Sequence, residues 1–78
     1  MAKPPIQIIA EKLAEARAME YALQYNVLKE HIKSLSDDEF LAQMVRVDNP
    51  HIFRYLWSIG LTYRQQIITA KRWEELTK

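Results

Sequence analysis

The sequence predicts an all-α fold, and three observations support this prediction. The 78 residues contain one glycine and three prolines, which is little material for the turns of a β-sheet. Long segments consist of good helix formers whose apolar residues recur every three or four positions. Two short segments carry the residues that start helices. We therefore expect one domain over residues 5–78, a small bundle in which a short capped helix bridges two long antiparallel helices.

The first long helix is expected over residues 5–34, after a flexible N-terminus of residues 1–4. Pro5 suits a first helical position, where a missing N–H group costs nothing. Two sets of apolar residues keep helical spacing along the segment: Ile9, Leu13, Ala16, Leu23 and Val27, and Tyr21, Tyr25, Leu28, Ile32 and Leu35. Because no proline or glycine interrupts either set, the pattern predicts one continuous helix.

The short helix is expected over residues 37–46. Ser36 and Glu39 have the spacing of a capping box, in which each side chain accepts a hydrogen bond from the other residue's backbone. Asp37 and Asp38 suit the positive end of the helix dipole. The predicted core face consists of Phe40, Leu41, Met44 and Val45.

The second long helix is expected over residues 50–76, with Asn49 as its cap and Pro50 as its first residue. Gly60 offers an alternative, because a glycine often ends a helix and a new helix can start near Thr62. The apolar residues that keep helical phase through Gly60 are Ile52, Leu56, Ile59, Tyr63, Ile67, Ala70 and Trp73. The unbroken phase favours one continuous helix.

This helix is apolar over so wide an arc that more than one neighbour is expected to cover it. A narrow polar stripe holds Arg54, Ser58, Thr62, Gln65, Thr69 and Arg72. Beside the core line runs a second apolar line, which consists of Phe53, Trp57, Leu61 and Ile68. Aromatic residues and arginine are common in protein interfaces. We expect a protein partner or a second copy of the chain to contact Phe53, Trp57, Leu61, Arg64 and Ile68. The alternative is that the first long helix and the short helix cover both apolar lines within one chain.

A second, weaker prediction concerns three polar residues spaced seven apart in the first helix, Arg17, Gln24 and His31. Polar residues along an apolar face can determine the register or the choice of a partner. The alternative is that they mark a gap between two packed neighbours, where long side chains reach water.

The residues of known catalytic and metal sites are mostly missing. The chain has no cysteine, and its two histidines, His31 and His51, lack the spacing of a zinc or di-metal motif. We therefore expect no enzyme activity, no metal and no cofactor or small-molecule substrate. No apolar run approaches the roughly 18 residues of a membrane span, and the N-terminus lacks a signal-peptide pattern, so a cytoplasmic location without membrane binding is expected.

Nucleic-acid binding is the alternative function. The second half of the chain interleaves aromatic residues with Arg46, Arg54, Arg64, Lys71 and Arg72. Basic side chains neutralise phosphates, and aromatic rings stack on unpaired bases. These basic residues do not share one helical face, however, and the net charge is only +1. The sequence favours a non-catalytic interaction module, such as a small adaptor, inhibitor or accessory subunit, over a nucleic-acid-binding accessory protein of replication or transcription.

Overall fold

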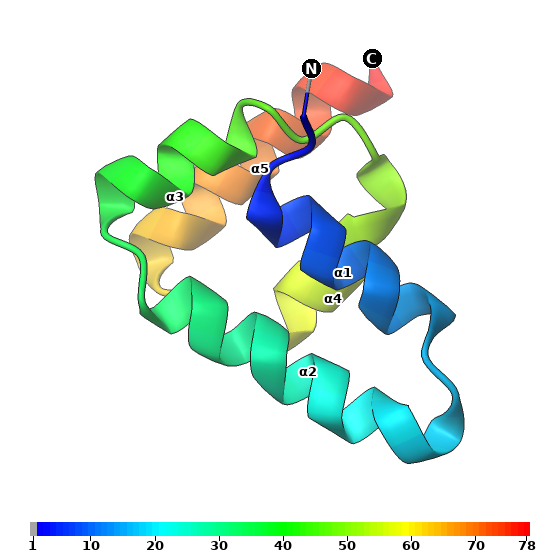
Figure 1. Cartoon of the computed structure of the whole chain (residues 1–78). Coiled ribbons are helices and arrows are strands. Elements are labelled where there is room, and N and C mark those ends of the chain that lie inside the picture. The colour runs from blue at the N-terminus through cyan, green and yellow to red at the C-terminus, as the bar shows by residue number, and fades with distance from the viewer. Residues whose placement is uncertain (1) are drawn as a thin grey trace.

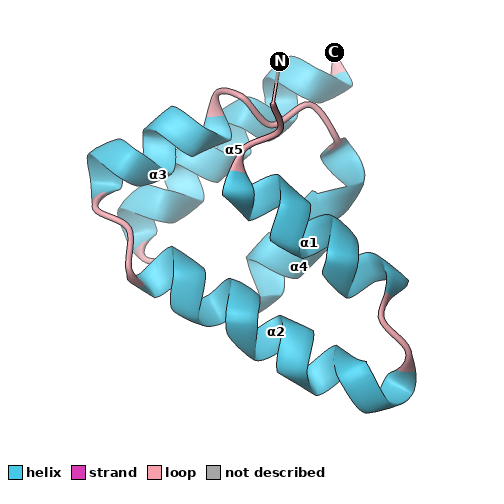
Figure 2. Cartoon of the chain, in the orientation of Figure 1, coloured by secondary structure: helices cyan, strands magenta, loops and turns pink. Residues whose placement is uncertain are grey.

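The computed structural model describes residues 2–78, which form helices and connecting loops (Figures 1 and 2). The helices are α1 (Pro5–Glu15), α2 (Ala18–Lys33), α3 (Asp37–Met44), α4 (Phe53–Ser58) and α5 (Tyr63–Thr77), and a short 3-10 helix, η1 (Pro50–Ile52), precedes α4. The prediction of an all-α fold is confirmed.

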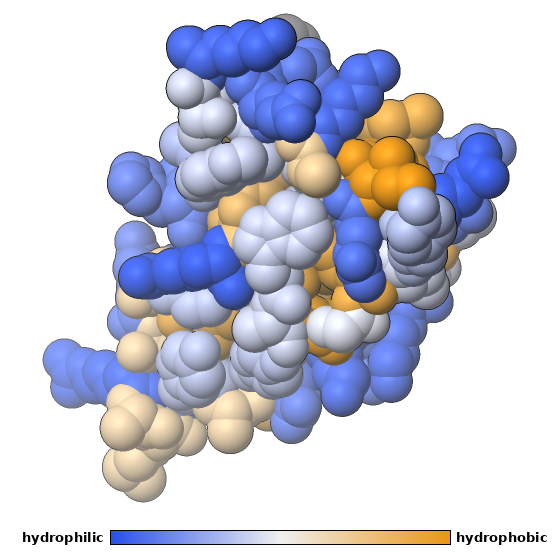
Figure 3. Space-filling model, turned by 180° about the vertical axis from the view of Figure 1, so that it is seen from behind, coloured by the Kyte–Doolittle hydropathy of each residue, from blue (hydrophilic) through white to orange (hydrophobic). Residues whose placement is uncertain are grey.

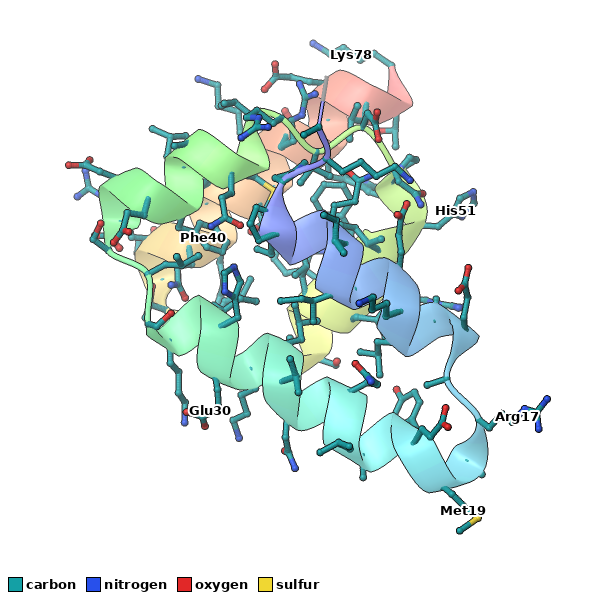
Figure 4. All side chains as sticks on the ribbon, viewed as in Figure 1. Arg17, Met19, Glu30, Phe40, His51 and Lys78 are labelled. Atoms are coloured by element: carbon teal, nitrogen blue, oxygen red, sulfur yellow. The ribbon has the colours of Figure 1, made fainter. Side chains whose placement is uncertain are left out.

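The helices surround one apolar core. In Figure 1, α2 turns back below α1 and packs against it, and α3 lies beside α5. α1 also contacts α3 and η1. The fully buried apolar side chains are Ile6, Ala10, Leu13, Leu28, Ile32, Phe40, Met44, Val47, Ile52, Phe53 and Leu56. Among them, Phe40 points from α3 toward the inside of the molecule (Figure 4).

The predicted continuous helix over residues 5–34 is wrong at its middle. Ala16 and Arg17 are extended, with ψ of 141° and 166°, and they separate α1 from α2. A straight helix of this length would span about 45 Å at about 1.5 Å per residue. The longest extent of the molecule is 33 Å. The chain therefore turns at Ala16 and Arg17 so that α2 can pack on α1.

This turn decides which of the two apolar sets of the first segment faces the core. Leu28 and Ile32 of the second set are buried between α2 and its neighbours. Leu23 and Val27 of the first set lie on the outer side of α2 and are exposed. The first set faces the core only within α1, where Leu13 is buried. The two sets therefore do not form two faces of one continuous helix.

The predicted continuous helix over residues 50–76 is also wrong, and the alternative with a break at Gly60 is correct. Gly60 has a φ of +87°, a left-handed conformation that glycine adopts without strain. Thr62 then caps α5: its hydroxyl accepts from the N–H of Gln65 at 3.2 Å, and its own N–H donates to Gln65 Oε1 at 3.1 Å. This second capping box fixes the start of α5 independently of α4.

Because α5 restarts after Gly60, it does not keep the helical phase of α4. Gln65 and Thr69, which belong to the predicted polar stripe, face the interior. Thr69 remains satisfied there because its hydroxyl donates to the carbonyl oxygen of Gln65 at 2.7 Å. Tyr63 and Ile67, which were expected in the core line, are exposed.

The remaining helix ends agree better with the sequence. The capping box of Ser36 and Glu39 is present, although α3 ends at Met44 and not at Arg46. Asn49 accepts a hydrogen bond from the N–H of His51 at 3.0 Å, so the predicted start at Pro50 is confirmed. With both long helices broken, the fold is a cluster of short helices and not a pair of long antiparallel helices.

Residues 1–4 were predicted to form a flexible N-terminus. Met1 lies outside the described residues. Pro4 is buried, Lys3 pairs with Glu11 at 2.9 Å, and the carbonyl oxygen of Ala2 accepts from Arg46 at 2.7 Å. These contacts tie residues 2–4 to α1 and to the segment after α3.

Candidate protein-interaction surface

The predicted partner-contact residues do not form one surface. Phe53 and Leu61 are buried in the core, Trp57 and Arg64 are exposed, and Ile68 is partly buried. Phe53 and Trp57 line one hollow, whereas Arg64 and Ile68 line another. The prediction combined residues on the two sides of Gly60, where the direction of the chain changes.

The first hollow lies between α4 and α5 and has a volume of about 400 Å³. Trp73 of α5 packs edge-on against Phe53, with ring centroids 5.5 Å apart. Arg54 stacks on Tyr55, 4.8 Å from the ring centroid, and donates to its hydroxyl at 2.7 Å. The large exposed apolar side chains of this hollow are Trp57 and Trp73, which are fewer than those of the second hollow.

The second hollow runs between α3 and α5 and is called the α3/α5 groove below. It consists of two adjoining hollows of about 420 and 410 Å³ that share Leu41, Ile67 and Ile68. Its four exposed apolar side chains are Leu41 (45% exposed), Val45 (54%), Tyr63 (79%) and Ile67 (52%). In the view from behind, Figure 3 shows a hydrophobic area in orange at the upper right, over α3 and α5. A concave apolar surface of this kind is suited to receive a side of another helix.

The phase of each helix explains why these residues face outward. α3 buries Phe40 and Met44, and this leaves Leu41 and Val45 on the groove side. The two helices run in the same direction, because Asp37 and Asp38 lie at the level of Arg64, and Val45 lies at the level of Lys71. Half of the predicted core face of α3, Leu41 and Val45, therefore lies at the surface.

The charged side chains that line the groove leave an acidic excess at one end and a basic excess at the other. Asp37 and Asp38 lie at the end where both helices begin, and Asp37 is 3.7 Å from Arg64. Lys71, Arg72 and Glu75 lie toward the other end, and Arg72 is 3.6 Å from Glu75. Asp38 and Lys71 are exposed, and residues 2–78 contain no ion pair to either of them.

The three residues predicted as a specificity line are separated in the structure. Arg17 lies at the corner between α1 and α2 and points outward (Figure 4), whereas Gln24 is partly buried. His31 faces α3, where its Nε2 is 3.2 Å from Gln43 Oε1, the same oxygen that accepts from the Ile6 N–H at 2.9 Å. The contact of His31 is thus within the fold, and the three residues do not share one exposed face.

Most of the basic residues predicted for nucleic-acid contact are bound to the protein itself. Arg72 donates twice to the carbonyl oxygen of Val47, at 2.9 and 2.7 Å, and also lies 3.6 Å from Glu75. As described above, Arg46, Arg54 and Arg64 are bound to Ala2, Tyr55 and Asp37. Arg46 and Arg72 line one hollow together with Lys3 and Asp48. Arg54 on α4 and Arg64 at the start of α5 line other hollows, so the predicted residues do not all converge on one phosphate-binding surface.

The ionisable groups with shifted pKa values make hydrogen bonds within the fold. Hydrogen bonds from Lys3, Asn49 and Gln7 lower the pKa of Glu11, and the same pairing raises the pKa of Lys3. Hydrogen bonds from Ser36 lower the pKa of Glu39. Among residues 2–78, no group of three or more histidine, aspartate or glutamate side chains is arranged to hold a metal ion. The helices of the same residues include none with the length and apolar character of a membrane span.

The sequence pattern did not identify Leu41, Val45, Tyr63 and Ile67 as surface residues. One local signal was available, because Thr62 and Gln65 have the same capping-box spacing as Ser36 and Glu39. That signal separates α5 from α4 and removes the reason to place Tyr63 and Ile67 in the core line.

Comparison of the chain with protein-family models, with curated proteins and with solved structures found no match.

Proposed function

We propose that this protein is a non-catalytic interaction module, such as a small adaptor, inhibitor or accessory subunit, whose α3/α5 groove receives an apolar helical segment of another protein chain. The observation that supports the proposal most is the exposure of four large apolar side chains along one concave surface. Water around such a patch is unfavourable, and contiguous exposed apolar surface is typical of interaction sites.

The shape of the groove supports a helix as the bound segment. α3 has eight residues and is therefore about 12 Å long at about 1.5 Å per residue. This length matches two to three turns of a bound helix, which presents apolar residues every three or four positions. The aliphatic residues Leu41, Val45 and Ile67 supply the apolar contact, and Tyr63 at the edge offers a hydroxyl group as well.

The polar residues around the groove support selectivity. Asp38 at one end and Lys71 at the other have no ion pair within residues 2–78, and they favour a bound helix with the opposite arrangement of charge. A helix with the same charge order would place like charges together, which is unfavourable.

Co-purification from the native cells tests this proposal when the groove is altered by a single side chain. We compare the tagged chain with Ile67→Glu and with Leu23→Glu, which makes the same type of change at an exposed position on α2. We expect a bound protein, either another protein or an untagged copy of this chain, to be retained by the unaltered chain and by Leu23→Glu. Ile67→Glu should lose it, because burial of the new carboxylate in an apolar interface is costly. Equal retention by all three proteins would contradict the proposal.

A further inference from the structure

We infer that the partner at the α3/α5 groove is a second copy of this chain, and that the helices α3 and α5 of the two copies pack on each other antiparallel across a two-fold axis. This inference rests on the proposed function and adds the identity of the partner. It is based on the distribution of charge along the groove. Arg64 pairs with Asp37 at one end and Arg72 pairs with Glu75 at the other, so Asp38 and Lys71 are the lining charges without an ion pair within residues 2–78, and the apolar residues lie between them.

The positions of Asp38 and Lys71 make the groove complementary to itself. The acidic end lies at the level of Arg64, and Lys71 lies seven residues further along α5, roughly 10 Å at about 1.5 Å per residue. A two-fold axis through the middle of the groove, near Ile67, turns one copy end for end relative to the other. Lys71 of each copy then comes to the level of Asp38 and Arg64 of the partner. Because Arg64 is already paired with Asp37, Asp38 is the carboxylate there that can accept Lys71 across the groove, and the same contact forms twice.

The same rotation places the apolar residues of one copy on those of the other. Leu41 and Ile67 lie in the shared middle of the two hollows, and Val45 and Tyr63 lie toward opposite ends. Val45 of one copy therefore approaches Tyr63 of its partner. All four exposed apolar side chains become covered without a change in the fold of either copy.

The size of the chain agrees with this partner. A domain of 78 residues buries a smaller fraction of its surface than a larger one, so its core has little margin of stability. Small chains often gain stability by association, and two-fold dimers are the commonest assemblies of identical chains.

Sedimentation equilibrium of charge-reversed variants tests this inference. In Asp38→Lys, both paired positions are basic, and in Lys71→Asp both are acidic. Each variant alone should dimerise at least about tenfold more weakly than the unaltered chain, because each dimer then contains two repulsive contacts in place of two attractive ones. An equimolar mixture of the two variants should restore dimerisation to within about threefold, because each contact then joins lysine to aspartate. The double variant Asp38→Lys/Lys71→Asp should also dimerise.

Controls and other outcomes separate this inference from the proposed function. Circular dichroism confirms that each variant is folded. Asp38→Lys loses the favourable interaction of Asp38 with the helix dipole at the start of α3, but this loss is the same when the variant is alone and when it is in the mixture. A difference in dimerisation between the two samples therefore reports the contact between the copies. A monomeric unaltered chain at about 1 mM, or dimers that respond equally to every variant, would overturn the inference. In either case the co-purification experiment still decides whether the groove binds a different protein. Failure of both experiments would reject the groove as a binding site.

Discussion

Gln7 and Asp48, 41 residues apart in the chain, are joined by two hydrogen bonds of opposite direction. The side-chain amide of Gln7 donates to Asp48 Oδ1 at 2.8 Å, and its oxygen accepts from the Asp48 N–H at 2.9 Å. Gln7 is buried on α1, and Asp48 lies in the loop before η1. A buried amide satisfied on both sides fixes that loop against α1.

We predict that Gln7→Met destabilises the protein by about 2–3 kcal/mol, because it keeps the side-chain volume but removes both hydrogen bonds to Asp48. Gln24→Met is the matched control, since Gln24 is only partly buried and its side chain makes no hydrogen bond within residues 2–78. The control should change stability by less than about 0.5 kcal/mol. Urea unfolding measures both differences, and equal effects of the two substitutions would contradict the role of the Gln7–Asp48 contact.

The sign of the effect of Gly60→Ala distinguishes a broken helix from a continuous one. No atom lies within 4 Å of the position that a Cβ would take, so the effect comes from the backbone conformation. At φ of +87° we predict a loss of about 1–2 kcal/mol. In a continuous helix the same substitution would stabilise the protein by about 1 kcal/mol.

A synthetic chain with D-alanine at residue 60 provides the control for this prediction. D-alanine prefers positive φ, so it should preserve or increase stability relative to glycine, because it restricts the unfolded chain. Thermal and urea unfolding should therefore rank D-alanine at or above glycine and L-alanine last. The reverse order would support the continuous helix over residues 50–76.

Stability should fall in acid in a way that depends on Glu11 and Glu39. Their pKa values in the folded chain are below the ordinary value of 4.5, because hydrogen bonds stabilise their charged forms. The folded state therefore binds fewer protons than the unfolded state as the pH falls through this range. The contribution of Glu11 and Glu39 to the free energy of unfolding is complete above about pH 5 and is lost progressively below about pH 4.5.

Glu11→Gln and Glu39→Gln should each make the loss of stability between about pH 5 and pH 3 shallower than in the unaltered chain. Glu30→Gln, which removes an exposed carboxylate on α2, is the control for the change in net charge (Figure 4). The urea midpoint measured against pH tests the prediction. If the urea midpoint falls as steeply with decreasing pH in both variants as in the control, the hydrogen bonds of Glu11 and Glu39 do not stabilise the folded state.

The groove residues should matter little for the stability of the isolated chain. We predict that Ile67→Ala costs less than about 1 kcal/mol when unfolding is measured at low micromolar concentration, because half of this side chain is already exposed to water. Ile52→Ala, at a buried position, should cost about 2–5 kcal/mol. Equal costs would place Ile67 in the core, as the helical phase of the sequence suggests.

Local signals in the sequence predicted part of the fold well. Ser36 with Glu39 and Asn49 with Pro50 located two helix starts, because caps depend on residues a few positions apart. The turn at Ala16 and Arg17 has no such signal, since both residue types favour helices and the break arises from packing of α2 on α1. Helical phase misled at Gly60, where α5 takes its own register.

These breaks also explain why the predicted contact residues do not coincide with the groove. Arg64 and Ile68 were predicted and lie in the groove, but Leu41, Val45 and Ile67 were assigned to the core. Their exposure depends on how α3 and α5 meet, which is a tertiary relationship between two segments that residues 45–62 separate in the chain. Apolar periodicity identifies residues that are expected to be buried. It does not show whether the same chain or a partner chain buries them.

Site-specific photo-cross-linking in the native cells tests the proposed role of the α3/α5 groove most directly. A photoreactive phenylalanine analogue replaces Tyr63 at the edge of the groove and, as the control, Glu30 on the outer side of α2. We predict a discrete protein adduct from residue 63 that disappears when Ile67→Glu is added, and no matching adduct from residue 30. The absence of an adduct at residue 63, or an adduct that Ile67→Glu leaves unchanged, would contradict the proposal that this groove binds a protein chain.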